Sequence, residues 1–186
     1  TYKEVRRLDA GSWYSDEYKG EKVPGLREVL ELAQGKIKLN IELKPADNGE
    51  ELARKTVALI EKYNMENDCV ITSFSSSALL SAKSCDENIR VGYILSAAYG
   101  DYYDMKNIDF FSVNAAYLSK RTIDAIHNSG KQVYAWTVNN KDSIKNLTNK
   151  GVDGVITDNP VLARETIYSR DTSETIVNMI RYVFNQ

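Results

Sequence analysis

The stretch Lys36-Ile37-Lys38-Leu39-Asn40-Ile41-Glu42-Leu43-Lys44-Pro45 decides the fold. Its apolar residues alternate strictly with polar ones, which predicts a strand with one apolar face. The other face carries Lys38, Asn40, Glu42 and Lys44. This pattern fits a half-exposed strand of an antiparallel sheet as well as a strand whose polar face lines a site.

The flanking sequence favours the second interpretation. Apolar residues at helical spacing precede the strand between Pro24 and Gly35, and a second helical pattern follows it from Leu52 to Tyr63. A strand between two helices is most simply a parallel, central strand that is covered on both faces. We therefore expect the charged face to point into an enclosed site, with Glu42 and Lys44 at its carboxyl end as the first candidates for chemistry.

The composition excludes several classes of function. The 186 residues, 42% of them hydrophobic, suffice for one domain with a single core. A net charge of −2 gives no electrostatic reason to expect nucleic acid or an anionic membrane as partner. No apolar run approaches the roughly 18 residues of a membrane-spanning helix. Cys69 and Cys85 lack the spacing of a metal site, and we expect buried free thiols.

Strand and helix patterns alternate along the rest of the chain. Strand patterns cover residues 37–43, 69–74, 89–95, 109–113, 132–138 and 152–156, and further helical patterns cover 76–84, 119–129, 142–149, 161–168 and 173–184. Strict alternation restricts the architecture to an open doubly wound sheet or a barrel. No glycine-rich dinucleotide or P-loop motif follows any strand. An eight-unit barrel takes about 250 residues, so six units match such a barrel without its first two strands.

Six short pieces of the sequence, taken together and in order, carry a specific resemblance. They are Leu8-Asp9-Ala10-Gly11-Ser12-Trp13, Val23-Pro24-Gly25-Leu26-Arg27-Glu28-Val29-Leu30, Leu39-Asn40-Ile41-Glu42-Leu43-Lys44, Ser73-Phe74-Ser75, residues 133–139 and residues 151–160. In this order they resemble the carboxyl-terminal three quarters of a glycerophosphodiester phosphodiesterase. The resemblance implies an α/β fold of the (β/α)8 TIM-barrel type, incomplete here, with about six parallel strands and helices outside. Residues 1–168 would form the partial barrel, with 1–22 as a lead-in loop containing a short helix, and 169–186 a helix packed on it.

The resemblance also implies an activity and a set of site residues. The family hydrolyses glycerophosphodiesters to an alcohol and glycerol 3-phosphate with a divalent metal, Ca or Mg. By position, Glu42 matches a metal-ligating glutamate, Lys44 a lysine that faces the phosphate, and Trp136 an aromatic residue of the substrate pocket. Phe74 would either close over the substrate or pack at the end of its strand. These roles suit the residues, because a carboxylate oxygen suits a hard cation and an ammonium group offsets charge on a phosphoryl group.

Other motifs of the family are missing from this sequence. An amino-terminal His-Arg-Gly, a second-strand Glu-x-Asp and a His-Asp pair supply the family's proton transfer and further metal ligands, and none occurs at a matching place. The single histidine, His127, falls on a predicted helix in the outer layer, where we expect a surface role. We therefore expect no catalytic residue within this chain, an incomplete metal site at Glu42, and little or no activity of the chain alone.

Two other functions stay open from the sequence. One is a non-catalytic barrel remnant that binds a phosphorylated ligand or serves as an assembly part, and another is a phosphoinositide-type phospholipase. Six strands would leave two open edges, so the barrel stays open, a second copy covers it by self-association, or residues 1–22 fill the gap. The compartment also stays open between the cytoplasm and a membrane reached through segments outside these residues.

Some polar and aromatic residues near strand ends have a structural interpretation beside the functional one. Asn139 and Asp158 lie where barrel sites form, but Asp158-Asn159-Pro160 favours helix capping. Three tyrosines, Tyr99, Tyr102 and Tyr103, would either wall a cleft or pack, and we favour packing.

Overall fold

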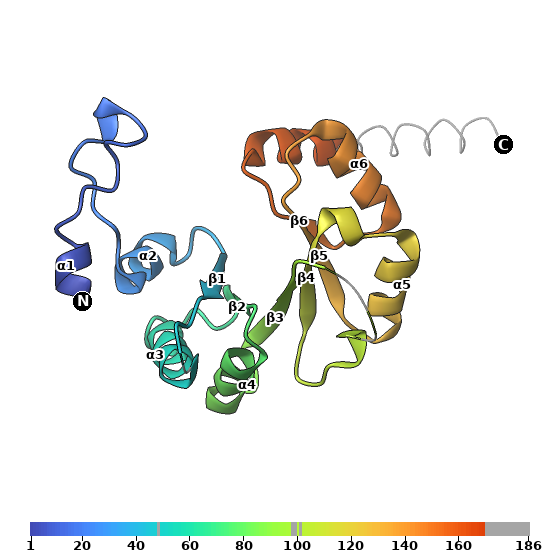
Figure 1. Cartoon of the computed structure of the whole chain (residues 1–186), viewed down its shortest axis with the longest axis horizontal. Helices are drawn as coiled ribbons and strands as arrows, with labels where there is room; N and C mark the ends of the chain where they lie inside the picture. The colour runs from blue at the N-terminus through green and yellow to red at the C-terminus, as the bar shows by residue number, and fades with distance from the viewer. Residues whose placement is uncertain (48, 98–99, 101, 170–186) are drawn as a thin grey trace.

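The computed structural model describes residues 1–47, 49–97, 100 and 102–169. Six parallel strands form one sheet in the order of the chain, β1-β2-β3-β4-β5-β6. The strands are β1 (Leu39–Leu43), β2 (Cys69–Ser73), β3 (Arg90–Leu95), β4 (Phe110–Asn114), β5 (Gln132–Trp136) and β6 (Gly154–Val155). The sheet curls into part of a barrel (Figure 1), which confirms the predicted incomplete TIM-barrel type with about six parallel strands.

Helices cover the convex side of the sheet. The covering helices are α2 (Leu26–Ala33), α3 (Gly49–Lys62), α4 (Ser76–Cys85), α5 (Lys120–Asn128), α6 (Lys141–Lys150) and a last described helix over 160–169. The short helix α1 (Tyr2–Val5) lies apart from the sheet in the amino-terminal segment (Figure 1), and 3-10 turns follow at η1 (Asp16–Tyr18), η2 (Tyr102–Asp104) and η3 (Ala115–Tyr117). In Figure 1, α3 and α4 lie beside the first strands, and α5 and α6 lie beside the last ones. None of the described helices has both the length and the apolar character to cross a bilayer.

The core lies between the convex face of the sheet and these helices. Alternate residues of the strands point to it, and Ile71, Val91, Val113, Val133 and Ala135 are completely buried. Helices supply the matching apolar residues, among them Val57, Ile60, Leu79, Ile123, Ile126 and Ile144. Burial of each aliphatic side chain of this size contributes about 1.5–3 kcal/mol to the free energy of folding. The layer between the sheet and its helices is therefore a main source of the stability of the part-barrel.

The concave face is packed by aromatic rings that lie over glycines. Gly92 of β3 pairs in register with Phe110 of β4, and a Cβ atom on Gly92 would lie 2.1 Å from the Phe110 ring. Gly154 of β6 pairs with Tyr134 of β5 in the same manner, and the Phe110 and Tyr134 ring centroids are 4.7 Å apart. Two small residues therefore make room for two rings that fill the middle of the barrel interior.

The amino-terminal residues form a compact loop outside the sheet. The Asp9 carboxylate accepts hydrogen bonds from the backbone N–H groups of Gly11, Ser12 and Gly20 and from the Ser12 hydroxyl. These bonds hold the pKa of Asp9 far below its ordinary value. The segment contacts α2 through an Arg6–Glu28 ion pair of 3.1 Å and lies beside that helix in Figure 1, so residues 1–22 do not fill the barrel gap.

Several sequence predictions need correction. The strand predicted over 37–43 begins at Leu39, where pairing with β2 begins, and Ile37 is 66% exposed. The last strand has two residues instead of five. Cys69 is buried but Cys85, the last residue of α4, is exposed, so the prediction of two buried thiols is wrong for Cys85. The helix predicted over 173–184, and its packing on the barrel, lie outside the described residues.

Candidate functional site

A cavity of about 370 Å³ opens on the concave face at the carboxyl ends of the strands. Parallel barrels carry their active sites at this end of the sheet. The cavity brings together all four residues that the sequence singled out, Glu42, Lys44, Phe74 and Trp136. Its other lining residues are Asn40, Thr72, Ile94, Ser112, Thr137 and Ile156.

The charged side of the cavity comes from the end of β1. Glu42 and Lys44 lie two residues apart, so both side chains leave the strand on the same face, and Lys44 Nζ is 3.4 Å from Glu42 Oε2. The Lys44 side chain is 77% exposed and the Glu42 side chain 33% exposed. The expectation of an enclosed site is therefore wrong. Because β1 is an edge strand of this sheet, its charged face is open to solvent.

The aromatic side of the cavity comes from β2 and β5. The rings of Phe74 and Trp136 meet edge to face, with centroids 6.2 Å apart. Trp136 Nε1 donates a hydrogen bond of 2.9 Å to the backbone oxygen of Ser112, which fixes the indole ring against β4. Phe74 is half exposed, so one face of the pair is available to a ligand.

A small polar floor lies below these side chains. The Thr72 hydroxyl donates a hydrogen bond of 2.9 Å to the Asn40 side-chain oxygen, which links β1 to β2 on the concave face. Sequence reasoning missed Thr72 and Ser112 as lining residues. Strand periodicity contains the signal, because Thr72 lies two residues before Phe74 and therefore on the same face.

Metal ligands are scarce around the cavity. Within the described ranges, no group of three or more His, Cys, Asp or Glu side chains is placed to hold a metal ion. Glu42 is the single carboxylate of the cavity lining, and Mg or Ca normally draws on several oxygen ligands. The described residues therefore do not by themselves form a divalent-metal site.

Polar residues after β5 and β6 form a corner beside the cavity. Asn139 donates a hydrogen bond of 2.7 Å from Nδ2 to Asp158 Oδ2, and its Oδ1 accepts from the Asp158 N–H and the Thr157 hydroxyl. Asn159 Oδ1 accepts from Leu162 N–H at the start of the next helix, as predicted for a capping residue. Neither Asn139 nor Asp158 lines the cavity.

His127 and the described tyrosines lie away from the site. His127 is on α5, where its Nε2 lies 2.9 Å from Asp153 Oδ2, so the predicted outer-layer position is confirmed. Tyr102 packs edge to face on Phe111, with centroids 5.3 Å apart, and Tyr103 also packs against the core. This confirms packing for these two, while Tyr99 lies outside the described residues.

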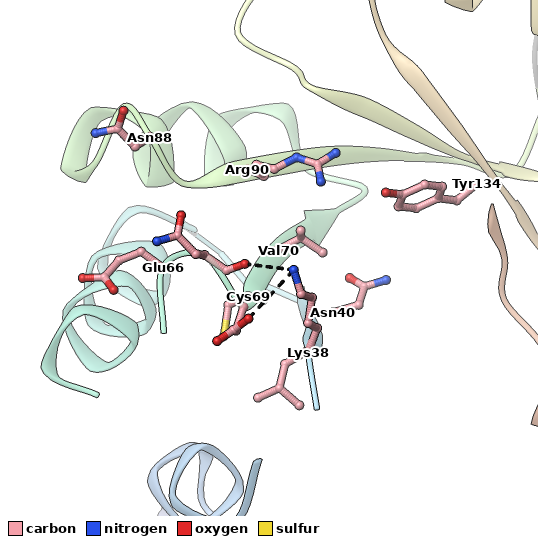
Figure 2. Close-up of a pocket in the computed structure, with 11 residues that line it drawn as sticks. Lys38, Asn40, Glu66, Cys69, Val70, Asn88, Arg90 and Tyr134 are labelled. Atoms are coloured by element: carbon pink, nitrogen blue, oxygen red, sulfur yellow. Dashed lines mark hydrogen bonds and ion pairs between the residues drawn. The ribbon is translucent and has the colours of Figure 1, made fainter. Parts of the chain in front are cut away.

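A second cavity, of about 340 Å³, opens at the amino ends of the strands. Figure 2 shows its mixed lining, with Arg90 and Tyr134 on one wall and Lys38 on another. Lys38 Nζ lies 3.5 Å from the Asn67 backbone oxygen and 3.9 Å from Asp68 Oδ1. Lys38 is thus paired with Asp68, and the active sites of parallel barrels lie at the other end of the strands, so the carboxyl-end cavity is the stronger candidate.

A curled parallel sheet with helices outside, and a charged and aromatic cavity at the carboxyl ends of its strands, places the chain among proteins of the (β/α)8-barrel class. The family model described as "Glycerophosphoryl diester phosphodiesterase family" matches residues 1–162. The chain belongs to this family, which confirms the resemblance found in the sequence.

Individual relatives agree with the family assignment. A glycerophosphodiester phosphodiesterase of Caldanaerobacter subterraneus subsp. tengcongensis is 28% identical, with 97% of this chain and 71% of the relative covered. A phosphodiesterase of Oleispira antarctica, solved in complex with the product sn-glycerol-3-phosphate, superposes with a TM-score of 0.76 at 29% identity over 90% of this chain and 70% of its own. A glycerophosphodiester phosphodiesterase of Parabacteroides distasonis shares the fold, with a TM-score of 0.80 at 22% identity over 92% of this chain and 72% of its own.

Proposed function

We propose that the carboxyl-end cavity binds the glycerol phosphate part of a glycerophosphodiester and is the substrate-binding part of a site for hydrolysis of such diesters to an alcohol and glycerol 3-phosphate. One observation carries this proposal: a cation, a carboxylate and two aromatic rings, drawn from β1, β2 and β5, line one cavity. The family membership and the product bound to the Oleispira antarctica relative support it.

Lys44 is the residue for the phosphate. Its ammonium group is largely exposed, and among the residues that the structure describes its ion-pair partner is Glu42, at 3.4 Å. A phosphate oxygen that approaches Lys44 gains a charge-assisted hydrogen bond, and the same charge offsets the negative charge that grows on the phosphoryl oxygens during attack. Glu42 holds the ammonium group toward the cavity and offers one oxygen to a divalent cation.

Phe74 and Trp136 are the residues for the glycerol carbons. Their edge-to-face pair presents apolar surface beside the charged end of the cavity. The Trp136 hydrogen bond to Ser112 fixes the ring, so the surface exists before a ligand arrives. Pre-formed apolar surface of this kind orients a small ligand at low entropic cost.

The described lining of this cavity has no side chain left for proton transfer, because its two ionisable groups already serve the cation and the phosphate. Glu42 and Lys44 are the ionisable side chains among the lining residues, and His127 lies on the outer helix layer. General acid and base catalysis contribute about 10²–10⁴-fold each. We therefore expect the 186-residue chain to bind ligand but to show little or no turnover.

Two measurements on the 186-residue chain test this proposal. Calorimetric titration with sn-glycerol 3-phosphate should show binding, and an assay with glycerophosphocholine and Ca or Mg should show no turnover above background. Absence of binding would refute the proposal that this cavity is the ligand-binding site. Turnover that disappears in Glu42→Gln would overturn the expectation of inactivity.

A second function, a non-catalytic module that binds a phosphorylated ligand, is favoured by the same lining, in which no ionisable side chain is left for proton transfer. A gene that encodes this segment alone would favour this second function, whereas an upstream reading frame with the family's His-Arg-Gly and Glu-x-Asp motifs would remove it.

A further inference from the structure

Ser73 joins the two strands that carry most of the site, although its side chain does not line the cavity. It is the last residue of β2, completely buried, and pairs in register with Leu43 at the end of β1. Its hydroxyl donates a hydrogen bond of 2.8 Å to the Leu43 backbone oxygen and accepts one of 3.0 Å from the Ser75 backbone N–H.

The two backbone groups that Ser73 holds belong to the peptide units of the site. The Leu43 oxygen is part of the peptide unit that joins Leu43 to Lys44, directly after Glu42. The Ser75 N–H is part of the peptide unit that joins Phe74 to Ser75. One buried hydroxyl therefore fixes the backbone on which the charged pair and the aromatic wall both depend.

We infer that Ser73 is a positioning residue that sets the distance between the Glu42–Lys44 pair and Phe74. This inference rests on the proposed function of the cavity. Thr72 and Phe74 point to the concave side, so the alternation of the strand places Ser73 on the helix side, away from any ligand. This geometry excludes a direct contact between the Ser73 side chain and a ligand in the cavity. Ser73 can act on the site only through the backbone groups that it holds.

The position of the bond explains why a small residue with a hydroxyl is needed. Beyond Leu43 the strand pairing ends, and the chain turns through Pro45, which has no N–H to donate. Ser73 is completely buried, so loss of its hydroxyl leaves the Leu43 oxygen without this partner in a buried place. Small displacements at a binding site have large effects, because ligand groups must meet their partners within about 0.5 Å.

The test compares three changes at Ser73 with one matched control. Ser73→Ala and Ser73→Cys remove or weaken the two hydrogen bonds, and Ser73→Thr keeps a hydroxyl. Thr56→Val is the control, because Thr56 is also buried and its hydroxyl donates a bond of 2.9 Å to the Leu52 oxygen within α3, away from the cavity. Hydrogen exchange of residues 42–46 and 73–77 measures the protection of the backbone amides without any ligand. Titration with sn-glycerol 3-phosphate measures the affinity of the cavity for its ligand.

We expect Ser73→Ala and Ser73→Cys to speed exchange in both segments about tenfold, and to weaken sn-glycerol 3-phosphate binding about tenfold, the effect of one lost buried hydrogen bond. Ser73→Thr should restore protection, and Thr56→Val should leave both segments unchanged. Unchanged exchange in Ser73→Ala, or equal loosening of these segments in Thr56→Val, would overturn the inference. If the unaltered chain binds no sn-glycerol 3-phosphate, the proposed function fails, while the exchange data still decide the role of Ser73.

Discussion

Replacement of Gly92 by alanine tests the packing of the concave face beneath the site. The new Cβ atom would lie 2.1 Å, 2.3 Å and 2.6 Å from three atoms of the Phe110 ring, whereas ordinary contact begins at 3.4 Å. Phe110 has no room to move, because it is completely buried, Tyr134 stacks on it at 4.7 Å, and the Arg90 guanidinium lies 5.6 Å from its ring centroid. Gly92 does not adopt a positive φ, so strain in the backbone is not the cause of the cost.

The expected loss can be estimated from this geometry. Overpacking of a core costs about 1–3 kcal/mol, and the short contacts place Gly92→Ala at the upper end, about 3 kcal/mol. For a chain of this length, a loss of that size lowers the melting temperature by about 6–12 °C. Gly154→Ala is the matched control, because its Cβ would lie 3.2 Å from a Tyr134 ring that is only half buried. At Gly154, alanine lowers the entropy of the unfolded chain, which stabilises the fold by about 0.4–1 kcal/mol and offsets the cost of the close contact. We therefore expect a change near zero in the free energy of unfolding.

Urea unfolding of both variants measures these free energies, and a Phe110→Leu change adds a direct check. Phe110→Leu makes room for the new methyl group, so it should cost less in the Gly92→Ala background than in the unaltered chain. Equal stability of Gly92→Ala and Gly154→Ala, or additive costs for Gly92→Ala and Phe110→Leu, would refute the packing described for the concave face.

Three other predictions concern single side chains of the described structure. Lys44→Gln should weaken sn-glycerol 3-phosphate binding, measured by calorimetry, about tenfold; the effect is no larger because solvent screens the exposed ammonium group. Lys55→Gln, which removes a comparable ion pair on α3, should bind sn-glycerol 3-phosphate with unchanged affinity. Trp136→Phe removes the hydrogen bond to Ser112, so urea unfolding should show a loss of about 1 kcal/mol of stability. Trp136→Phe should keep most of the affinity for sn-glycerol 3-phosphate, because it keeps an aromatic ring, whereas Trp136→Ala should lose most of it. Burial raises the pKa of the Cys69 thiol to about 11, so at pH 8 it stays protonated, and iodoacetamide should modify only Cys85 until the protein unfolds. Equal affinities of the two lysine variants, unaltered binding by Trp136→Ala, or rapid modification of both thiols would contradict the respective prediction.

The faces of the strands follow from local patterns, which explains why they were predictable, whereas the barrel order of the strands was implied by the family resemblance. Alternation around Glu42 places it on the same side as Lys44 whether or not the neighbours are known. The fold class follows from six repeats of strand and helix, because parallel strands need a crossover helix each. Trp136 was found by resemblance and Phe74 by its place at a strand end, and the structure brings both to one cavity with the charged pair.

Features that depend on partners distant in the sequence were not predictable. Alternation continues to Ile37, but the strand begins at Leu39 because the first backbone bond to the neighbouring segment is Leu39 N–H to the Asp68 oxygen, 2.7 Å. The exposure of Glu42 depends on β1 lying at the edge of the sheet, which no local pattern reveals. The role of Ser73 depends on a carbonyl group that lies thirty residues earlier in the chain.

The most direct test of the account is an NMR titration of the unaltered chain with sn-glycerol 3-phosphate, followed at the Trp136 indole N–H and the Lys44 amide. Binding in the carboxyl-end cavity should give saturable shifts at these two groups and at Phe74. Shifts that gather instead around Lys38 and Arg90, at the amino ends of the strands, or no saturable shift at all, would contradict it.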